Sequence, residues 1–186
     1  RTIHIGWDGN YWHQGSLGLS ENPTVVCIAN VTGQSQSDMW TLKGVPMFLQ
    51  VAEHMPKLSF LLVGAAQRGD TPKNVTVMGR VSRDRLREIL SQAWVYAHPS
   101  LTESMSTSVG EAMLCECVPV VSGVNGDADL VGDTGIVVGV QDVNKWVKSI
   151  ENGIEMTRQG KGTLARDRML QYFSLERRSD ALLEVV

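Results

Sequence analysis

The sequence predicts an α/β protein with a Rossmann-like, doubly wound parallel sheet of about six strands and flanking helices. Short β-branched runs recur along the chain and are apolar nearly throughout, as strands covered on both faces are. Segments with apolar residues at helical spacing lie between several of these runs. Because the two kinds of segment alternate, parallel strands joined by crossover helices fit the pattern best.

The expected strands cover residues 24–29, 58–64, 74–79, 94–100, 118–123 and 135–139. A first helical stripe follows the first strand and consists of Val45, Phe48, Leu49, Ala52 and Met55. A second stripe begins behind Ser82, a suitable N-cap, and consists of Leu86, Ile89, Leu90 and Ala93. A third stripe consists of Val143, Trp146, Val147, Ile150 and Ile154.

Two further helices are expected, one that begins near residues 104–106 and one that closes the chain over 172–186. Residues 65–74 are too few and too polar for a full helix, so the crossover there is reduced. A polar loop is expected between the first strand and Lys43.

The bulk properties fit one compact domain. Its 186 residues leave little room for a second core, so we expect a domain over residues 24–186 and a lead-in or interdomain linker over residues 1–23. A net charge of −3 and a pI near 5.8 argue against a nucleic-acid partner. The three cysteines lack metal-ligand spacing and are interpreted as buried thiols in the reducing cytoplasm. The chain begins without a methionine, and we expect it to be part of a longer protein.

Unusual residues follow several of the expected strands. They include Lys43-Gly44 after the first strand and its polar loop, Gly79-Arg80-Val81 after the third, and His98 with Glu103 at the end of the fourth. Since the carboxyl ends of parallel strands meet at one edge of a sheet, a ligand is expected at that edge.

The segment "TESMSTSVGEAM" (102–113) has features of a phosphate site. It follows a strand and opens a helix, whose exposed amides and dipole favour an anion. Small hydroxyl residues, Ser104, Ser106, Thr107 and Ser108, allow close approach to the backbone. Glu103 can accept from sugar hydroxyls, and Glu111 can bind the vicinal diol of a ribose. These features together predict a nucleotide sugar, but on this segment alone a capped helix with two surface acids is an equal alternative.

Three longer motifs carry a resemblance to a known family. "LKG" (42–44), "VTVMGRV" (75–81) and "HPSLTESMSTSVGEAMLCECVPVV" (98–121) occur in this order, between "IHIGWD" (3–8) and "YFSLERRSDALLEVV" (172–186). In this order the chain resembles the C-terminal, donor-binding half of the group 1 glycosyltransferases, retaining enzymes of the GT-B fold. The resemblance implies hexosyl transfer from a nucleoside-diphosphate sugar without a metal or other cofactor.

The resemblance also implies roles for individual residues. Lys43 and Glu103 would be catalytic, with Lys43 neutralising the donor diphosphate and Glu103 contacting the donor sugar. Glu111 would hold the ribose. The remaining donor-binding positions would be Gly79, Arg80 and Val81 at the base, and Ser104, Met105, Ser106 and Thr107 at the distal phosphate.

The sequence departs from the family pattern at two places. Asn30 stands where the family has an arginine that shares the diphosphate, so either phosphate affinity is weaker or another arginine substitutes. Ser104-Met105 replaces the usual Phe-Gly. In this family the acceptor site belongs to an N-terminal domain, which also gives many relatives peripheral association with the inner face of the membrane. Without that domain, we expect these 186 residues to bind donor weakly and to transfer nothing.

The sequence also admits other interpretations. Asp127 and Asp129 could form an Asp-x-Asp metal site, but glycines on both sides favour a polar turn, and Asp127 is expected to be dispensable for donor binding. Asp129 matches the family's acid in this turn. His98 is expected to bond to local backbone, and Trp40 is a weak candidate for stacking on a ligand. Functional alternatives are a non-catalytic nucleotide-sugar-binding module, or a sugar-nucleotide epimerase or phosphorylase of the same fold.

Overall fold

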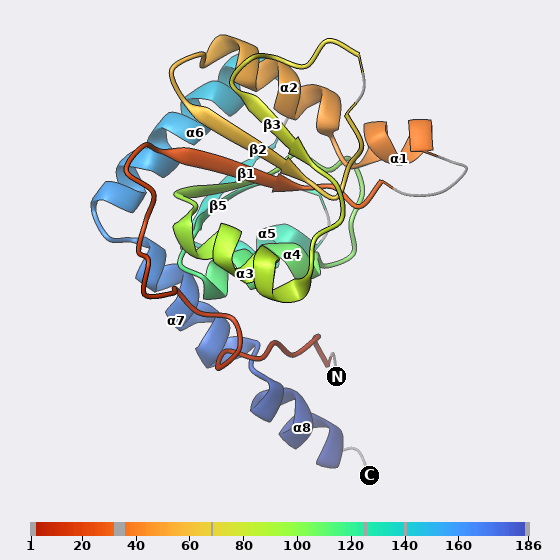
Figure 1. Cartoon of the computed structure of the whole chain (residues 1–186). Coiled ribbons are helices and arrows are strands. Elements are labelled where there is room, and N and C mark those ends of the chain that lie inside the picture. Colours follow the sequence, from red (N-terminus) through yellow and green to blue (C-terminus); the bar gives the residue numbers. More distant parts are fainter. Residues whose placement is uncertain (1–2, 32–35, 68, 125, 140, 185–186) are drawn as a thin grey trace.

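Strands of one parallel sheet form the centre of the protein, in the order β3-β2-β1-β4-β5-β6 (Figure 1). This computed structural model describes residues 3–31, 36–67, 69–124, 126–139 and 141–184. The strands are β1 (Thr24–Ile28), β2 (Ser59–Val63), β3 (Val75–Met78), β4 (Val95–His98), β5 (Val118–Ser122) and β6 (Ile136–Val138). Every neighbouring pair is parallel, so the predicted sheet and its doubly wound order are confirmed.

Helices cover both faces of this sheet. Their bounds are α1 (Gln36–Leu42), α2 (Val45–His54), α3 (Arg83–Gln92), α4 (Thr107–Leu114), α5 (Gly126–Val131), α6 (Val143–Arg158), α7 (Gly162–Tyr172) and α8 (Leu175–Leu183). Successive strand residues point to opposite faces. Val25 and Cys27 therefore pack with α2 and α6, whereas Val26 packs with α3, α4 and α7. The result is the three-layer arrangement expected for a parallel sheet.

The predicted helical stripes are confirmed by burial and capping. Phe48 of α2 and Trp146 of α6 are both 1% exposed, and the other stripe residues of these helices pack against the same core cluster. The Ser82 hydroxyl accepts from the Arg85 amide at 3.2 Å, which is the predicted N-cap of α3. Between β2 and β3, the described residues contain no helix, in agreement with a reduced crossover.

Three helices were not predicted. α1 lies in the expected polar loop, α5 lies in the expected turn, and α7 precedes the closing helix α8. α1 and α5 have seven and six residues, too few to show an apolar repeat, so their stability depends on tertiary contacts. In α7 the buried residues Gly162, Ala165 and Met169 are mostly small, and such a stripe gives a weak hydrophobic signal.

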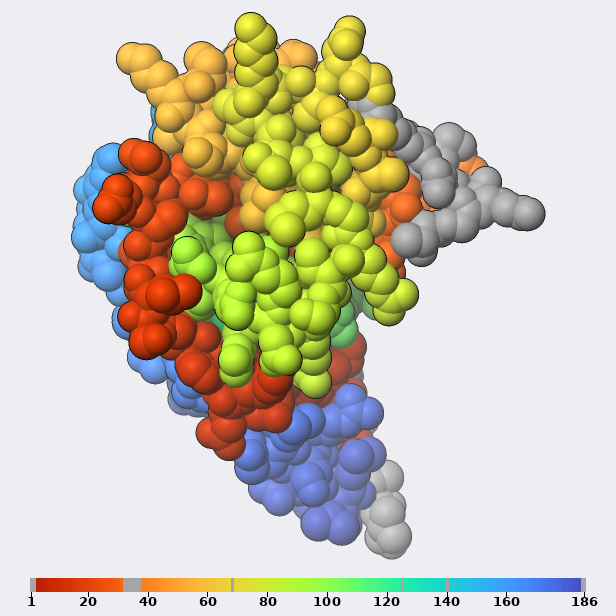
Figure 2. Space-filling view, in the orientation of Figure 1, coloured from red at the N-terminus to blue at the C-terminus, as the bar shows by residue number. Residues whose placement is uncertain are grey.

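The N-terminal segment packs along the domain. Trp7 donates its amide to Phe173 O at 2.9 Å, and Trp12 is 1% exposed. Arg166 of α7 donates to Gly9 O at 2.9 Å and to Trp12 O at 2.8 Å. Figure 2 shows this segment, in red, as a band between α3 and the C-terminal helices. The described part of residues 1–23 thus contributes two tryptophans to the core, and its role as a link to another domain stays a prediction.

Candidate functional site

A cavity of about 270 Å³ lies at the point where the sheet changes direction. β1 and β4 are neighbours, and the strands that follow each of them continue toward opposite edges. Ligands of doubly wound sheets bind at this switch point, beyond the carboxyl ends of the strands. The predicted site residues that line the cavity are Lys43, Glu103, Met105, Ser106, Thr107 and Glu111. Asn30, His98 and Ser108 also line it.

The other predicted positions do not line the cavity. Gly79 and Arg80 are exposed after β3, and Val81 packs against the core. β2 separates β3 from β1, so these three residues share the carboxyl edge with the cavity without facing it. Ser104 is exposed, and its carbonyl accepts from the Gly126 amide at 2.8 Å. Their assignment to a nucleotide base and a distal phosphate stays a prediction.

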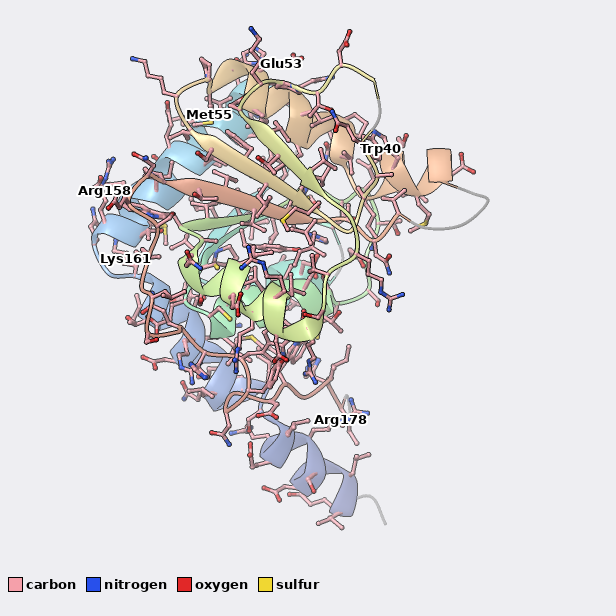
Figure 3. All side chains as sticks on the ribbon, in the orientation of Figure 1. Trp40, Glu53, Met55, Arg158, Lys161 and Arg178 are labelled. Atoms are coloured by element: carbon pink, nitrogen blue, oxygen red, sulfur yellow. The ribbon has the colours of Figure 1, made fainter. Side chains whose placement is uncertain are left out.

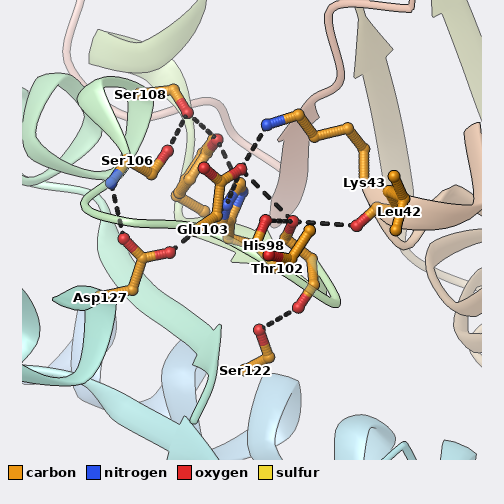
Figure 4. Close-up of polar contacts among 11 residues, drawn as sticks. Leu42, Lys43, His98, Thr102, Glu103, Ser106, Ser108, Ser122 and Asp127 are labelled. Atoms are coloured by element: carbon orange, nitrogen blue, oxygen red, sulfur yellow. Dashed lines mark hydrogen bonds and ion pairs between the residues drawn. The ribbon is translucent and has the colours of Figure 1, made fainter. Parts of the chain in front are cut away.

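Lys43 reaches the site because the loops after α1 and β4 are bonded to each other. The Leu101 amide donates to Leu42 O at 2.8 Å. Gly44 then turns the chain into α2 with a φ of 68°, and a Cβ at this position would lie 1.9 Å from Pro99 O. Only glycine fits both the left-handed backbone and this close approach. Lys43 is therefore held over the end of β4, where its ammonium forms an ion pair with Glu103 (Figure 4).

Glu103 is held in the ionised form. Burial by itself would raise the pKa of this carboxyl, but the approach of His98 Nε2 and the hydrogen bond and charge of the Lys43 ammonium lower it to about 2. The Lys43 ammonium, the Ser100 hydroxyl at 3.3 Å and His98 Nε2 at 3.4 Å all approach the same oxygen, Oε1. Oε2 takes no part in these three contacts. It is therefore the oxygen that can accept from a ligand hydroxyl.

The pKa of Glu111 is shifted in the opposite direction from that of Glu103. It lies in the second turn of α4, and burial raises the pKa of its carboxyl to about 7, while the charge of Arg83 opposes that rise. A ligand that donates hydrogen bonds to this carboxylate would stabilise its ionised form and lower its pKa again. Arg83, at the start of α3, does not line the cavity, and its guanidinium lies over the Tyr11 ring, 4.3 Å from the centroid.

The first turn of α4 differs from the prediction of bare amides at residues 104–107. Ser106 is the N-cap residue, and its amide donates to the Asp127 carboxylate at 2.7 Å. The hydroxyls of Ser106 and Ser108 lie 2.9 Å apart, and Tyr96 donates its hydroxyl to Ser108 at 2.7 Å. One of the predicted anion-binding amides is thus occupied by a carboxylate of the same chain.

Asp127 and His98 depart from their expected places. Asp127 lies in the short helix α5 instead of a turn, and it is completely buried. Its contact with Ser106 makes it a structural neighbour of the site, and the expectation that it is dispensable for donor binding stays a prediction. His98 is 1% exposed and faces side-chain carboxylates, not local backbone. Asp127 is 21 residues from Ser106 in the sequence, so no local spacing could have revealed the contact.

Two weaker candidates from the sequence, Asp129 and Trp40, do not line the cavity. Asp129 is exposed while Asp127 is buried, and across the described ranges no three His, Cys, Asp or Glu side chains are grouped so as to hold a metal ion. Trp40 of α1 packs against the same core cluster as α2 (Figure 3). The cavity itself is lined by the Lys43 ammonium, the Glu103 and Glu111 carboxyls, the buried His98 imidazole and the first turn of α4.

The comparisons with known proteins agree with this geometry. Residues 22–155 match the family "Glycosyl transferases group 1", which is well over half of the chain. The chain belongs to the group 1 glycosyl transferases. The family assignment from the motifs is thereby confirmed.

Two curated relatives of this group 1 glycosyl transferase chain match parts of it. Alpha-galactosylglucosyldiacylglycerol synthase of Streptococcus pneumoniae is 32% identical over 114 residues, which is 54% of this chain and 29% of that protein. The phosphatidylinositol N-acetylglucosaminyltransferase GPI3 subunit of Saccharomyces cerevisiae is 30% identical over 87 residues, 46% of this chain and 19% of that protein. The chain thus spans less than a third of either relative.

Solved structures share the whole fold of the group 1 chain. Sucrose-phosphate synthase from Thermosynechococcus elongatus has a TM-score of 0.84 at 21% identity, over 100% of this chain and 51% of that one. Anabaena HepE in complex with UDP-glucose has a TM-score of 0.80 at 19% identity, over 100% of this chain and 56% of that one. At this identity the likeness establishes the GT-B-type fold and not the ligand. Among the described residues, every helix is too short or too polar to span a lipid bilayer.

Proposed function

We propose that this chain is the donor-binding domain of a retaining, metal-independent glycosyltransferase. The enzyme would transfer a hexose from a nucleoside-diphosphate sugar to an acceptor. The observation that carries the proposal is the cavity at the switch point, where Lys43, Glu103, Glu111 and the first turn of α4 converge. Each of these groups matches one part of such a donor.

The diphosphate would lie between Lys43 and the first turn of α4. The ammonium has three donors, so a phosphate oxygen can share it with Glu103. Negative charge grows on the nucleoside diphosphate as it leaves, and a fixed cation with a helix N-terminus stabilises that charge. This arrangement supplies the positive charge by itself, which supports the proposal that no metal ion is needed.

The two carboxyls would bind the two polyhydroxylated parts of the donor. Glu111 would accept from the ribose diol, because two donated hydrogen bonds favour its ionised form. Ionised Glu103 would accept from hydroxyls of the transferred sugar through Oε2. Gly79, Arg80 and Val81 would meet the base only if the nucleotide extends from the cavity along the carboxyl edge toward β3.

The acceptor would bind to a second domain outside these residues. The chain spans 51% and 56% of the two solved structures, which leaves a comparable length for that domain in such proteins. The names of both curated relatives contain a lipid, diacylglycerol and phosphatidylinositol. This supports an acceptor at a membrane surface, reached through the second domain, and a position at the cytoplasmic face stays a prediction.

A binding panel tests the proposal. UDP, GDP and ADP, each alone and as a sugar nucleotide, would be titrated into the purified chain by calorimetry, with EDTA and with Mn²⁺ in parallel. We expect one base to be preferred, with the same affinity in both buffers. If none of the nucleotides binds, or if binding requires the metal, the donor site or its metal independence is refuted. Sugar transfer by these 186 residues alone would refute the role as half of an enzyme.

A second candidate is a nucleotide-sugar-binding module without catalysis. Asn30 favours it, because this residue lines the cavity in place of the arginine found in the family. The discriminating measurement is sugar transfer by the chain joined to an acceptor-binding domain, an activity that such a module would lack. Transfer by that longer protein, lost in its Lys43→Gln variant, would favour the enzyme.

A further inference from the structure

A buried histidine that lines the cavity lies between two carboxylates (Figure 4). His98 Nε2 lies 3.4 Å from Glu103 Oε1 and 3.5 Å from Asp127 Oδ2. The side chains of His98, Glu103 and Asp127 are 2%, 14% and 0% exposed. Within the described part of the chain, neither His98 Nε2 nor Asp127 Oδ2 has a hydrogen bond of good geometry. Unpaired buried polar atoms are rare, so this pair calls for an explanation.

The surroundings of His98 determine which nitrogen carries the proton. Nε2 faces oxygens of two carboxylates, and a bare lone pair at that position would repel both, so Nε2 is protonated. Nδ1 lies 3.5 Å from the Tyr96 hydroxyl, which donates its own proton to Ser108. The rings of Tyr96 and His98 stack with centroids 5.9 Å apart. The imidazole therefore stacks on Tyr96 with one face and has an oxygen within 3.5 Å of each ring nitrogen.

Asp127 is also held in place. Its Oδ1 accepts from the Ser106 amide at 2.7 Å, and the neighbouring Gly126 amide donates to Ser104 O at 2.8 Å. A Cβ on Gly126 would lie 2.2 Å from that oxygen, so this close approach requires glycine. The start of α5 is thus bonded at two points to the loop that follows Glu103.

The negative charge on Asp127 indicates that its second carboxylate oxygen has a partner. An asparagine would satisfy the Ser106 amide equally well through its own Oδ1. A buried carboxylate is costly, so its retention indicates a partner for the second oxygen, Oδ2. In the described structure, His98 Nε2 lies 3.5 Å from Oδ2, and its inferred proton would be that partner.

We propose that Asp127 is a positioning residue that holds His98 and, through it, the Glu103 carboxylate in the orientation that accepts from the hydroxyls of the donor sugar. The inference rests on the proposed role of Glu103 in sugar binding. It extends that function by adding His98 and Asp127 as residues that help the site to distinguish a nucleotide sugar from the bare nucleotide.

The test compares Asp127→Asn with Asp129→Asn, an exposed aspartate of the same helix. Calorimetry would use three pairs of probes: UDP with UDP-glucose, GDP with GDP-mannose, and ADP with ADP-glucose. For the pair that the parent binds, Asp127→Asn should lower the affinity for the sugar nucleotide about tenfold, the effect of one misplaced hydrogen bond to a charged group. The affinity for the bare nucleotide should change less than about twofold. Asp129→Asn should alter neither.

A double-variant cycle separates positioning from simple support of the fold. On a Glu103→Gln background, Asp127→Asn should cause no further loss, because both act on the same contact. Equal losses for nucleotide and sugar nucleotide, or additive losses in the double variant, would overturn the inference. Should Asp127→Asn fold poorly, His98→Phe keeps the ring on Tyr96 but lacks the N–H, and it should show the same selective loss.

A measurement without ligand keeps this inference distinct from the proposed function. The ¹⁵N resonances of His98 should report the Nε2-protonated tautomer in the parent and should shift in Asp127→Asn but not in Asp129→Asn. An unchanged His98 spectrum in Asp127→Asn would overturn the inference alone. If the parent binds none of the six probes, the proposed function is refuted instead.

Discussion

Replacing Glu111 with glutamine should stabilise the ligand-free protein at neutral and higher pH. Burial raises the pKa of this carboxyl from its ordinary 4.5 to about 7 in the folded chain. The folded state therefore binds a proton more tightly than the unfolded state, and stability falls as pH rises from about 4.5 to about 7. At about 1.4 kcal/mol for each pKa unit, the loss reaches about 3 kcal/mol, an upper bound because solvent reaches part of the side chain.

Glutamine resembles the protonated acid and removes this loss. At about pH 8 we expect Glu111→Gln to unfold at a temperature up to about 6–12 °C higher than the parent, given about 2–4 °C per kcal/mol for a chain of this size. Near pH 5 most of the difference should vanish, since the parent is then largely protonated at this position. Thermal unfolding at the two pH values measures the effect. Glu151→Gln, at an exposed position of α6, is the control and should show no such pH dependence.

The same substitution should weaken nucleotide binding. Ribose hydroxyls would donate to the ionised carboxylate, so the affinity of the parent for a nucleotide should rise as pH passes through about 7. In Glu111→Gln the affinity should be lower by about tenfold or more and independent of pH in this range. A variant that is less stable than the parent at about pH 8 would refute the reasoning about burial. Unchanged nucleotide affinity would refute the assignment of the ribose to Glu111.

Two further predictions concern how the cavity is held together. Lys43→Gln should lower the affinity for nucleotide and sugar nucleotide alike by about 10- to 100-fold, because it removes a charged phosphate donor, and calorimetry should show no effect for Lys57→Gln at an exposed position. Gly44→Ala should destabilise the chain by about 3 kcal/mol or more in urea unfolding, because its Cβ would overlap Pro99 O. Gly160→Ala shares the left-handed backbone but meets nothing within 4 Å, so a similar loss there would contradict the clash.

The alternation of strands and helices could be predicted because it depends on local spacing. Runs such as "VPVVSG" (118–123) are apolar throughout, and the stripe through Trp146 repeats at helical spacing, so each indicates its own element without knowledge of the rest. The strand boundaries agree within one or two residues, whereas α6 continues to Arg158, beyond the predicted stripe, and α8 covers Leu175–Leu183 instead of residues 172–186. Short elements such as α5 escaped prediction, because six residues contain too little periodicity to distinguish a helix from a turn.

The site was predicted in part for the same reason. Lys43, Glu103 and Glu111 follow strands or open a helix, and parallel strands bring such positions to one edge. Gly79, Arg80 and Val81 satisfy the same rule, yet they do not face the cavity. The rule places a residue at an edge, but the order of strands along that edge depends on packing across the whole sheet.

The sequence by itself determined the family, the class of fold and the edge at which the candidate cavity lies, because motifs and periodicity are local properties of the chain. Only the tertiary structure decided that β1 lies beside β4, that Trp7 and Trp12 belong to the core, and that Asp127 meets Ser106 and His98. Those contacts join segments far apart in the sequence. They form where packing brings the segments together, and no repeat or spacing in the chain encodes them.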